Sequence, residues 1–238
     1  MKGFLFDLDN TLYDRYGTIR AICEQFSDTL GPWLTPGYTL EKAIGHFLHT
    51  ESLYIMTGWG TVYEKLVEEH FFNSENTPSR KEFLAFIVEG MNNVAVPFPF
   101  TVPVLTELKK NGYIVGLLTN NTAWHRQYIK LDLLGMRDIF DIIVVSGEYA
   151  EQMCGDKENR AYEKPAPAIF RYTAEKLGVK PEELYYVGDN PINDIIGARN
   201  GGMVPVWIRS RSPWILPDNE LPEHCFDTVE GCLTLIGK

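Results

Sequence analysis

Two aspartates separated by one residue, Asp7 and Asp9, follow the first apolar segment of the chain, residues 3–6. A buried parallel strand reads as a nearly continuous apolar run, and ligands of open α/β sheets bind beyond the carboxyl ends of such strands. Carboxylates at that place could hold a hard divalent cation, act as a nucleophile or transfer protons. The pair therefore predicts a site at the end of the first strand.

Polar residues follow three further apolar runs in the same way. These runs and the residues after them are 113–118 with Thr119 and Asn120, 141–145 with Ser146 and Gly147, and 184–187 with Gly188 and Asp189. A fifth run, residues 203–208, contains Pro205, which favours an edge strand because proline cannot donate a ladder hydrogen bond. Since the carboxyl ends of parallel strands meet at one edge of a sheet, we expect the polar residues to converge there.

Segments with helical spacing alternate with the apolar runs, and each ends just before a glycine, which is a helix stop signal. The segments are Val102, Leu105 and Leu108 before Gly112; Tyr128, Leu131 and Leu134 before Gly135; and Ile169, Tyr172 and Leu177 before Gly178. This alternation predicts an α/β fold with a Rossmann-like, doubly wound parallel sheet that helices cover on both faces.

Four short motifs occur in a fixed order along the chain. They are Asp7-Leu8-Asp9-Asn10-Thr11, then Thr119-Asn120, then Lys164-Pro165, and then Gly188-Asp189 with Asp194 downstream. In this order they resemble the motifs of the haloacid dehalogenase-like (HAD) hydrolase superfamily, from the first strand to the last helix of the core. Each motif alone also suits a turn, a helix cap or a solvated loop. Four of them in order at the ends of apolar runs favour an active site.

The resemblance implies a phosphomonoester hydrolase that depends on Mg²⁺ and forms an aspartyl-phosphate. It makes Asp7 the nucleophile, and Asp9 the acid that protonates the leaving oxygen and then the base that activates water. The protein ligands of Mg²⁺ would be Asp7, the backbone carbonyl of Asp9, and Asp189. A cation is needed because a carboxylate would otherwise repel the phosphate dianion that it attacks.

The resemblance also assigns the phosphate-binding groups. Thr119 through its hydroxyl, Asn120 through its backbone N–H, and Lys164 would hold phosphate oxygens, the first two at the start of a helix. Asp194 would support the water shell of the metal or Lys164.

The connection between Ser146 and Lys164 is longer than is usual in the family, which leaves Lys157 as another candidate for the lysine of the motif. The following Pro165 favours Lys164. We hypothesise that this long loop, residues 148–162, packs against the helical segment between the first strand and Pro97, or against a partner subunit, and restricts access of substrate; the alternative is a mobile surface insertion. The side chains that suggest a contact surface are Tyr149, Met153 and Tyr162.

Several other functions share parts of this motif pattern. A 2-haloacid dehalogenase needs no proton for its halide leaving group, so Asp9 favours a phosphatase, whereas a phosphomutase shares Asp9 and stays open. A catalytically idle binding protein would be expected to carry a damaged motif, and all four motifs are intact. A phosphorelay receiver domain uses similar residues, but its phosphorylated Asp follows a later strand, where this chain has Ser146.

The chain between the first strand and Pro97 reads as helices throughout and predicts a small bundle. Its periodic apolar residues are Ile19, Ile22, Cys23 and Phe26; Leu40, Ile44, Phe47 and Leu48; Val62, Leu66 and Val67; and Phe83, Phe86 and Ile87. This segment resembles the helical cap of one branch of the superfamily. We expect an α/β core of residues 1–13 and 97–238 and a cap of residues 14–96.

Some cap side chains could face the substrate pocket, although an aromatic residue at helical spacing more often belongs to a core. These side chains are Trp33, His46, His49, Tyr54 and Trp59. The sequence therefore does not identify the substrate.

The composition narrows the partners. A net charge of -10 argues against nucleic acid, which is bound through basic surfaces, but allows a small phosphorylated metabolite such as a nucleotide or a sugar phosphate. The four cysteines form no CxxC pair, and no apolar stretch is long enough to span a bilayer. We expect a cytoplasmic monomer or homodimer with no membrane partner.

Overall fold

The computed structural model describes residues 1–210 and 212–237. The chain divides into two compact units, one of residues 1–14 and 97–238 and the other of residues 15–96. We call the first the α/β unit and the second the helical unit.

A six-stranded parallel sheet with the strand order β3-β2-β1-β4-β5-β6 forms the centre of the α/β unit. The strands are β1 (Gly3–Phe6), β2 (Ile114–Thr119), β3 (Ile142–Val145), β4 (Leu184–Gly188), β5 (Val204–Ile208) and β6 (His224–Phe226). Phe6 lies opposite Leu117 of β2 and Val187 of β4, so Asp7 and Asp189 leave the sheet at the same edge. The predicted fold class is confirmed.

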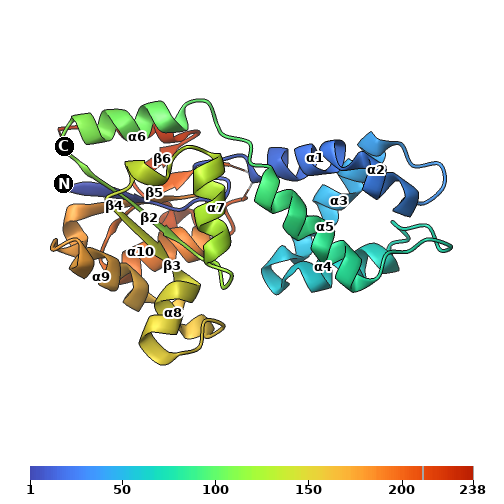
Figure 1. Cartoon of the computed structure of the whole chain (residues 1–238). Helices are drawn as coiled ribbons and strands as arrows, with labels where there is room; N and C mark the ends of the chain where they lie inside the picture. The colour runs from blue at the N-terminus through green and yellow to red at the C-terminus, as the bar shows by residue number, and fades with distance from the viewer. Residues whose placement is uncertain (211, 238) are drawn as a thin grey trace. The chain divides into compact units, whose positions relative to one another are not determined.

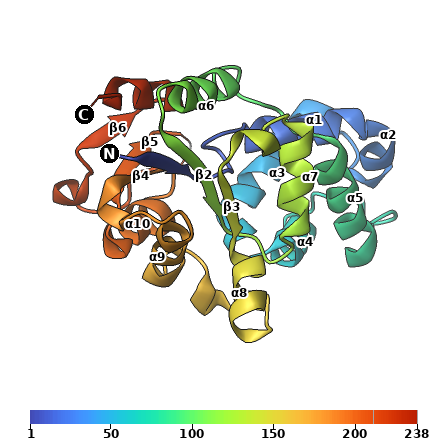
Figure 2. The same ribbon diagram turned by 60° about the vertical axis from the view of Figure 1, so that its left-hand side comes forward.

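Helices cover both faces of this sheet. They are α6 (Thr101–Lys110), α7 (His125–Leu133), α8 (Ser146–Cys154), α9 (Pro167–Lys176) and α10 (Gly197–Gly201). Figures 1 and 2 show α6 on one side of the sheet and α9 and α10 on the other. The glycines predicted to end α6, α7 and α9 all have positive φ angles, of 82° at Gly112, 63° at Gly135 and 67° at Gly178. Glycine adopts this left-handed conformation without the steric penalty that a Cβ atom imposes.

The prediction that β5 is an edge strand is wrong, because β6 pairs with it on its outer side. The pairing begins only at Val206, opposite His224, so Pro205 precedes the part of β5 that β6 covers. A proline at that place withholds no N–H from the β5–β6 ladder. The three residues of β6 were missed because a run this short has no recognisable apolar pattern.

The expected long loop before Lys164 is largely helical. Helix α8 occupies its first part, and a short 3-10 turn, Arg160–Tyr162, precedes the lysine. Tyr149 of α8 is buried, and its ring contacts the rings of Tyr162 and Tyr172 at centroid distances of 5.5 and 4.4 Å. Tyr149 therefore belongs to the core of the α/β unit. The hypothesis had required this side chain to lie on a contact surface.

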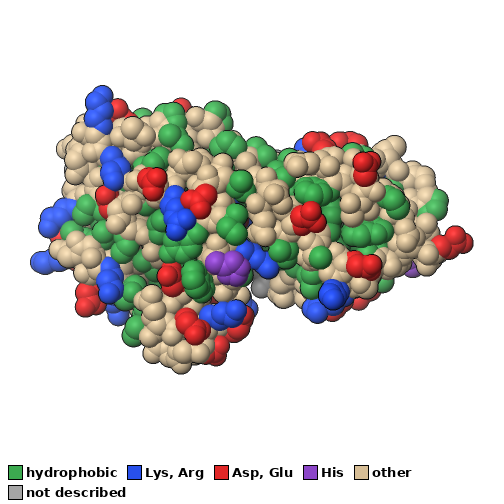
Figure 3. Space-filling view, viewed as in Figure 1, with side chains coloured by type: hydrophobic (Ala, Val, Ile, Leu, Met, Phe, Trp, Pro, Cys, Tyr) green, Lys and Arg blue, Asp and Glu red, His purple; other side chains and the backbone are tan. Residues whose placement is uncertain are grey.

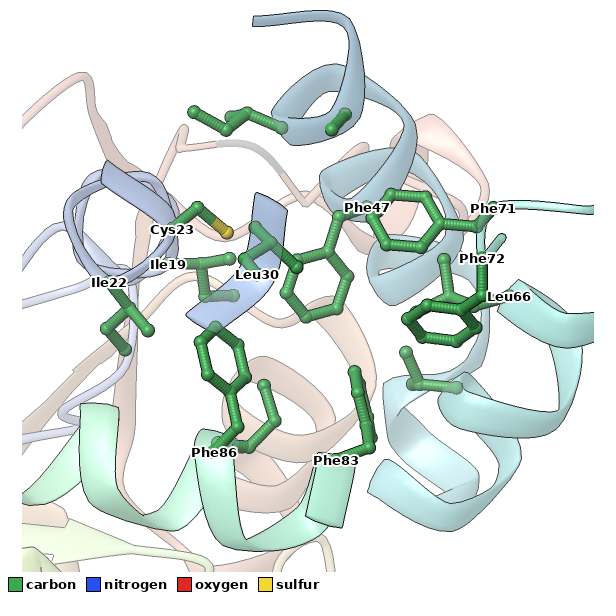
Figure 4. Packing of buried hydrophobic residues seen from close by; sticks show 14 residues of the cluster. Ile19, Ile22, Cys23, Leu30, Phe47, Leu66, Phe71, Phe72, Phe83 and Phe86 are labelled. Carbon is green, nitrogen blue, oxygen red and sulfur yellow. The ribbon is translucent and has the colours of Figure 1, made fainter. Parts of the chain in front are cut away.

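The helical unit has a hydrophobic core of its own, as the periodicity predicted. Its helices are α1 (Arg15–Gln25), α2 (Ser27–Leu30), α3 (Leu40–Tyr54), α4 (Trp59–Glu68) and α5 (Arg80–Asn93). Figure 4 shows Phe47 of α3 and Phe83 and Phe86 of α5 pointing into this core. Burying an aromatic side chain of this size removes a large apolar area from water and stabilises the bundle.

The aromatic and imidazole residues considered as pocket residues have mostly structural roles. Trp33, Tyr54 and Trp59 pack against the core of the helical unit. His46 lies 3.1 Å from the hydroxyl of Tyr38 and 2.9 Å from Glu69. His49 is exposed.

Charged side chains of both signs are spread over the surface. Figure 3 shows Lys and Arg side chains interspersed with Asp and Glu on the visible face of each unit. Across residues 1–210 and 212–237, no helix combines the length and the apolar character needed to cross a bilayer.

Candidate active site

A buried lysine, Lys164, lies at the centre of the predicted site. Its ammonium group donates hydrogen bonds to Oδ1 of Asp7 and Oδ1 of Asp194, both at 2.7 Å, and to the hydroxyl of Tyr186 at 2.8 Å. Lys164 is 3% exposed, whereas Lys157, the other candidate, is exposed. The structure therefore brings Lys164, and not Lys157, to the aspartates.

Asn120 fixes the backbone at Lys164. Its side-chain amide donates to the carbonyl of Lys164 and accepts from the N–H of Lys164, each at 2.9 Å. The loop after β2 is thus tied to the lysine motif, which is 44 residues away in sequence. The expectation that Thr119 and Asn120 begin a helix is wrong, because Thr119 ends β2 and α7 begins only at His125.

Asp189 is held by groups from β5 and from the segment after it. Ser210 and Ser212 donate their hydroxyls to Oδ2 of Asp189 at 2.9 and 2.6 Å, and the indole N–H of Trp207 donates to its backbone carbonyl at 2.9 Å. Oδ1 of Asp189 has no such contact among these three groups, so it is the oxygen better placed to bind a ligand. Sequence reasoning missed both serines, because a serine in a loop carries no signal of its own.

Asp194 approaches the end of β4 closely. The backbone N–H of Asn190 donates to its Oδ2 at 2.9 Å. A Cβ atom built on Gly188 would lie 2.4 Å from the carboxyl carbon of Asp194, so only glycine leaves room for this carboxylate.

Three buried residues, Asp7, Asp189 and Asp194, each offer one carboxylate oxygen to a common cluster. These three oxygens lie within 4.8 Å of one another. Oxygen donors in such a cluster suit a hard divalent cation, so these residues fit the Mg²⁺ that the family resemblance implies. The sequence placed Asp194 only in a supporting role, and the structure places it directly beside the other two carboxylates.

The electrostatics of the cluster point the same way. Burial raises the pKa of Asp7 from 3.8 to about 8; Lys164 opposes this rise, and Asp194 adds to it. Burial, with a further contribution from Asp194, raises the pKa of Asp189 from 3.8 to about 6. Burial disfavours the charged form of Lys164, but Asp194 and Asp7 raise its pKa well above 10.5 and keep it protonated. One ammonium group does not balance three carboxylates, so the site has room for more positive charge.

Asp9 lies in a separate set of contacts. Its Oδ1 accepts from the hydroxyl of Tyr13 at 2.5 Å and from the ammonium group of Lys130 at 3.1 Å. The side-chain amide of Gln127 donates to Oδ2 of Asp9 at 3.4 Å and to the hydroxyl oxygen of Thr119 at 3.2 Å. Sequence reasoning missed Gln127 and Lys130. The available signal was their spacing of three residues, which places both on one face of the helix.

Comparison with known proteins identifies the class. A family model described as a haloacid dehalogenase-like hydrolase matches residues 1–202. The chain belongs to this family, as its four motifs predicted, and the prediction of a hydrolase is confirmed.

Three similar proteins illustrate the range of the family. A glyceraldehyde 3-phosphate phosphatase of Methanopyrus kandleri is 31% identical over an alignment of 250 positions, which covers 96% of this chain and 97% of that protein. A phosphoserine phosphatase of Thermus thermophilus is 28% identical over an alignment of 246 positions, which covers 92% of this chain and 94% of that protein. The crystal structure of a HAD phosphatase from Thermococcus onnurineus matches with a TM-score of 0.60 and 25% identity over 100% of this chain and 98% of that one.

Proposed function

We propose that the protein is a Mg²⁺-dependent phosphatase that hydrolyses a small phosphorylated metabolite, such as a nucleotide or a sugar phosphate, through an aspartyl-phosphate. Relatives named as phosphatases support the reaction class, and their named substrates differ, so they do not select one substrate. The observation that supports the proposal most strongly is that the carboxylates of Asp7 and Asp9 contact different groups. Asp7 lies against Lys164 in the carboxylate cluster, and Asp9 lies apart in contact with Lys130.

In the proposed mechanism, Asp7 attacks the phosphorus atom in line with the leaving oxygen. Lys164 and the hydroxyl of Thr119 hold phosphate oxygens, together with the backbone N–H of Asn120. The hydroxyl oxygen of Thr119 accepts from Gln127, which leaves its hydrogen for the phosphate. Lys164 also bridges Asp7 and Asp194, so it orients the nucleophile.

Asp9 completes the two half-reactions. It donates a proton to the leaving oxygen in the first step, and in the second it takes a proton from the water that attacks the aspartyl-phosphate. A halide would not need that proton, so a second acid in this place supports a phosphatase over a dehalogenase.

The carboxylates of Asp7 and Asp189 and the backbone carbonyl of Asp9 would hold Mg²⁺, with Asp194 supporting its water shell. When bound, the cation supplies the positive charge that a phosphate dianion needs to approach the buried carboxylates. The raised pKa of Asp7 and Asp189 in the protein alone supports this assignment, because burial and the neighbouring carboxylates outweigh the compensating charge of Lys164.

Residues 15–96 would act as a cap that excludes water and selects the leaving group, and residues 1–14 and 97–238 as the catalytic core. The proposed setting is the cytoplasm. The four cysteines support it, since they are free thiols rather than disulfides.

The experiment that tests this function measures hydrolysis of 4-nitrophenyl phosphate with Mg²⁺, after thorough chelation, and after Mg²⁺ is restored. We expect turnover only with the metal, and none in Asp7→Asn. Release of halide from a 2-haloacid is measured in parallel. Turnover that survives chelation, or halide release in place of phosphate release, would contradict the proposal.

A further inference from the structure

Two polar residues of α7, Gln127 and Lys130, are buried in a way that the motif residues do not explain. Lys130 is 8% exposed, although it lies in the last turn of its helix, where lysine normally extends into solvent. Its ammonium group lies 4.6 Å from the centre of the Tyr13 ring and forms an ion pair with Asp9. Lys130 is thus enclosed on the side that faces the first motif.

Gln127 is fully buried, and the amide nitrogen and the carbonyl oxygen of its side chain differ in their hydrogen bonding. Its amide nitrogen donates to Asp9 and to Thr119. Its carbonyl oxygen, Oε1, is buried and has no hydrogen-bond partner among the described residues. A buried carbonyl without a donor is unfavourable, and leucine in its place would remove that penalty. The hydrogen bonds that the amide nitrogen donates to the Asp9 carboxylate and the Thr119 hydroxyl therefore explain why an amide occupies this position.

These contacts define the orientation of one carboxylate. Oδ1 of Asp9 accepts from Tyr13 and Lys130, and Oδ2 accepts from Gln127. A carboxylate that accepts hydrogen bonds through both oxygens cannot rotate freely about the Cβ–Cγ bond. Its direction matters, because a general acid must lie within hydrogen-bond reach of the leaving oxygen.

We propose that Lys130 and Gln127 are positioning residues, through which α7 fixes the Asp9 carboxylate for proton transfer to the leaving group and from the attacking water. The inference rests on the proposed phosphatase function, because it gives both residues a role only through Asp9. A purely structural role, in which the same contacts only tie α7 to the loop after β1, is the alternative that the experiment must separate.

The test uses Lys130→Met, Lys130→Arg and Gln127→Leu in the full chain, with Lys109→Met as the control. Lys109 also pairs with an aspartate in the α/β unit, Asp141, at 2.7 Å, but both side chains are more than a third exposed. Initial rates are measured with Mg²⁺ for aryl phosphates whose leaving groups differ in pKa, and unfolding temperatures are measured for every variant.

Lys130→Met should lower kcat for phenyl phosphate by about tenfold or more, since general acid catalysis is worth roughly 10²–10⁴-fold, and should lower it less for 4-nitrophenyl phosphate. Lys130→Arg should restore most of the rate, because the guanidinium also donates to a carboxylate. Gln127→Leu should show the same dependence on leaving group to a smaller extent, and it serves as the readout if Lys130→Met does not fold. Lys109→Met should keep the parent rates.

A double-mutant cycle with Asp9→Asn gives the sharpest result. If Lys130 acts through Asp9, adding Lys130→Met to Asp9→Asn should cost no further activity. An equal loss for all leaving groups, a change confined to KM, or a full additional loss in the double variant would overturn the inference while leaving the phosphatase function in place. Absence of turnover in the unmodified protein would instead overturn the proposed function, and this inference with it.

Discussion

At the scale of single residues, the site is organised around the ammonium group of Lys164. Its side chain is 2% exposed and lies between Asp7 and Asp194. An isolated ion pair would lower the pKa of a carboxylate, yet the pKa of Asp7 is raised to about 8. Burial and the neighbouring carboxylates outweigh the lysine, so the same geometry that fixes Lys164 also leaves the cluster in need of a further cation.

Removing this ammonium group should destabilise the α/β unit. Lys164→Met would leave Asp194 buried without its partner, and breaking a buried pair costs about 3–5 kcal/mol. We expect a loss of about 3 kcal/mol in the free energy of unfolding measured in urea, the lower end of that range, because protonation of Asp7 relieves part of the repulsion. The matched control, Lys109→Met, breaks a pair whose side chains are each more than a third exposed and should cost about 1 kcal/mol or less. Equal losses in the two variants would show that the buried cluster is not coupled through Lys164.

The two motif aspartates should fail in different ways. Asp7→Asn should abolish turnover and the phosphorylated intermediate, because an amide cannot replace the nucleophile. Asp9→Asn should slow poor leaving groups the most, by about 10²-fold or more, because proton delivery is lost. A series of aryl phosphates and acid quenching of the labelled intermediate distinguish the two. A uniform loss across the series for Asp9→Asn would assign Asp9 another role.

At the scale of elements, the end of β4 controls the position of Asp194. The close approach of this carboxylate to Gly188 joins the strand to the short π-helix Pro191–Ile196 that follows it. Asp194 is 1% exposed and bonded to Lys164, so it cannot move aside without disturbing the lysine. The strand end and the cluster of Asp7, Asp189 and Asp194 are therefore one packed unit.

Gly188→Ala should then disrupt both packing and activity. The added Cβ would lie 2.4 Å from the Asp194 carboxyl carbon, and overpacking of this kind costs about 1–3 kcal/mol. We expect lower stability and at least a tenfold lower turnover, as a rough estimate for a displaced catalytic group. Gly45→Ala on the exposed side of α3 meets no atom within 4 Å and should stabilise by about 0.5–1 kcal/mol. If Gly188→Ala retained the parent kcat and unfolding temperature, Asp194 would not be held as tightly as the contacts imply.

The sequence predicted the elements that have strong local patterns and missed contacts that only folding creates. β1, β2 and the motif residues were predictable because apolar runs and the polar residues after them are continuous in sequence. The contact of Lys130 with Asp9 was not predictable. The neighbouring sequence does not distinguish a lysine that contacts Asp9 from a lysine that is solvated at the end of a helix. Helix α8 was read as a loop because its apolar residues are few, and its burial depends on contacts with α9.

At the scale of the whole molecule, each of the two units has a core of its own, and the buried cluster of Asp7, Asp189 and Asp194 belongs to the α/β unit. The stability of that unit should therefore respond to pH and to divalent cations through Asp7 and Asp189. The net charge of -10 adds a general excess of negative charge, but exposed charges are screened by salt. The buried cluster is screened much less and should dominate the response.

The direction of this response follows from the raised pKa values. Between about pH 4 and about pH 8, folded Asp7 retains a proton that the unfolded chain has lost, and Asp189 does so up to about pH 6. The folded state then binds more protons than the unfolded state, so the free energy of unfolding of the metal-free protein should fall as the pH rises through this range. At the proposed site Mg²⁺ would bind the ionised carboxylates, so its stabilising effect should grow over the same range.

Thermal unfolding at pH 6 and pH 8, with and without Mg²⁺, measures this effect. A saturating cation at about 100 times its Kd adds about 2.7 kcal/mol, which corresponds to a rise of roughly 5–10 °C in the unfolding temperature of the α/β unit. We expect the larger rise at pH 8 and a much smaller one in Asp189→Asn, which lacks one carboxylate. Zn²⁺ or Ca²⁺ at the same concentration shows how far the effect depends on the cation. A Mg²⁺ shift that is equal at the two pH values, or that persists in Asp189→Asn, would place cation binding away from the three buried aspartates.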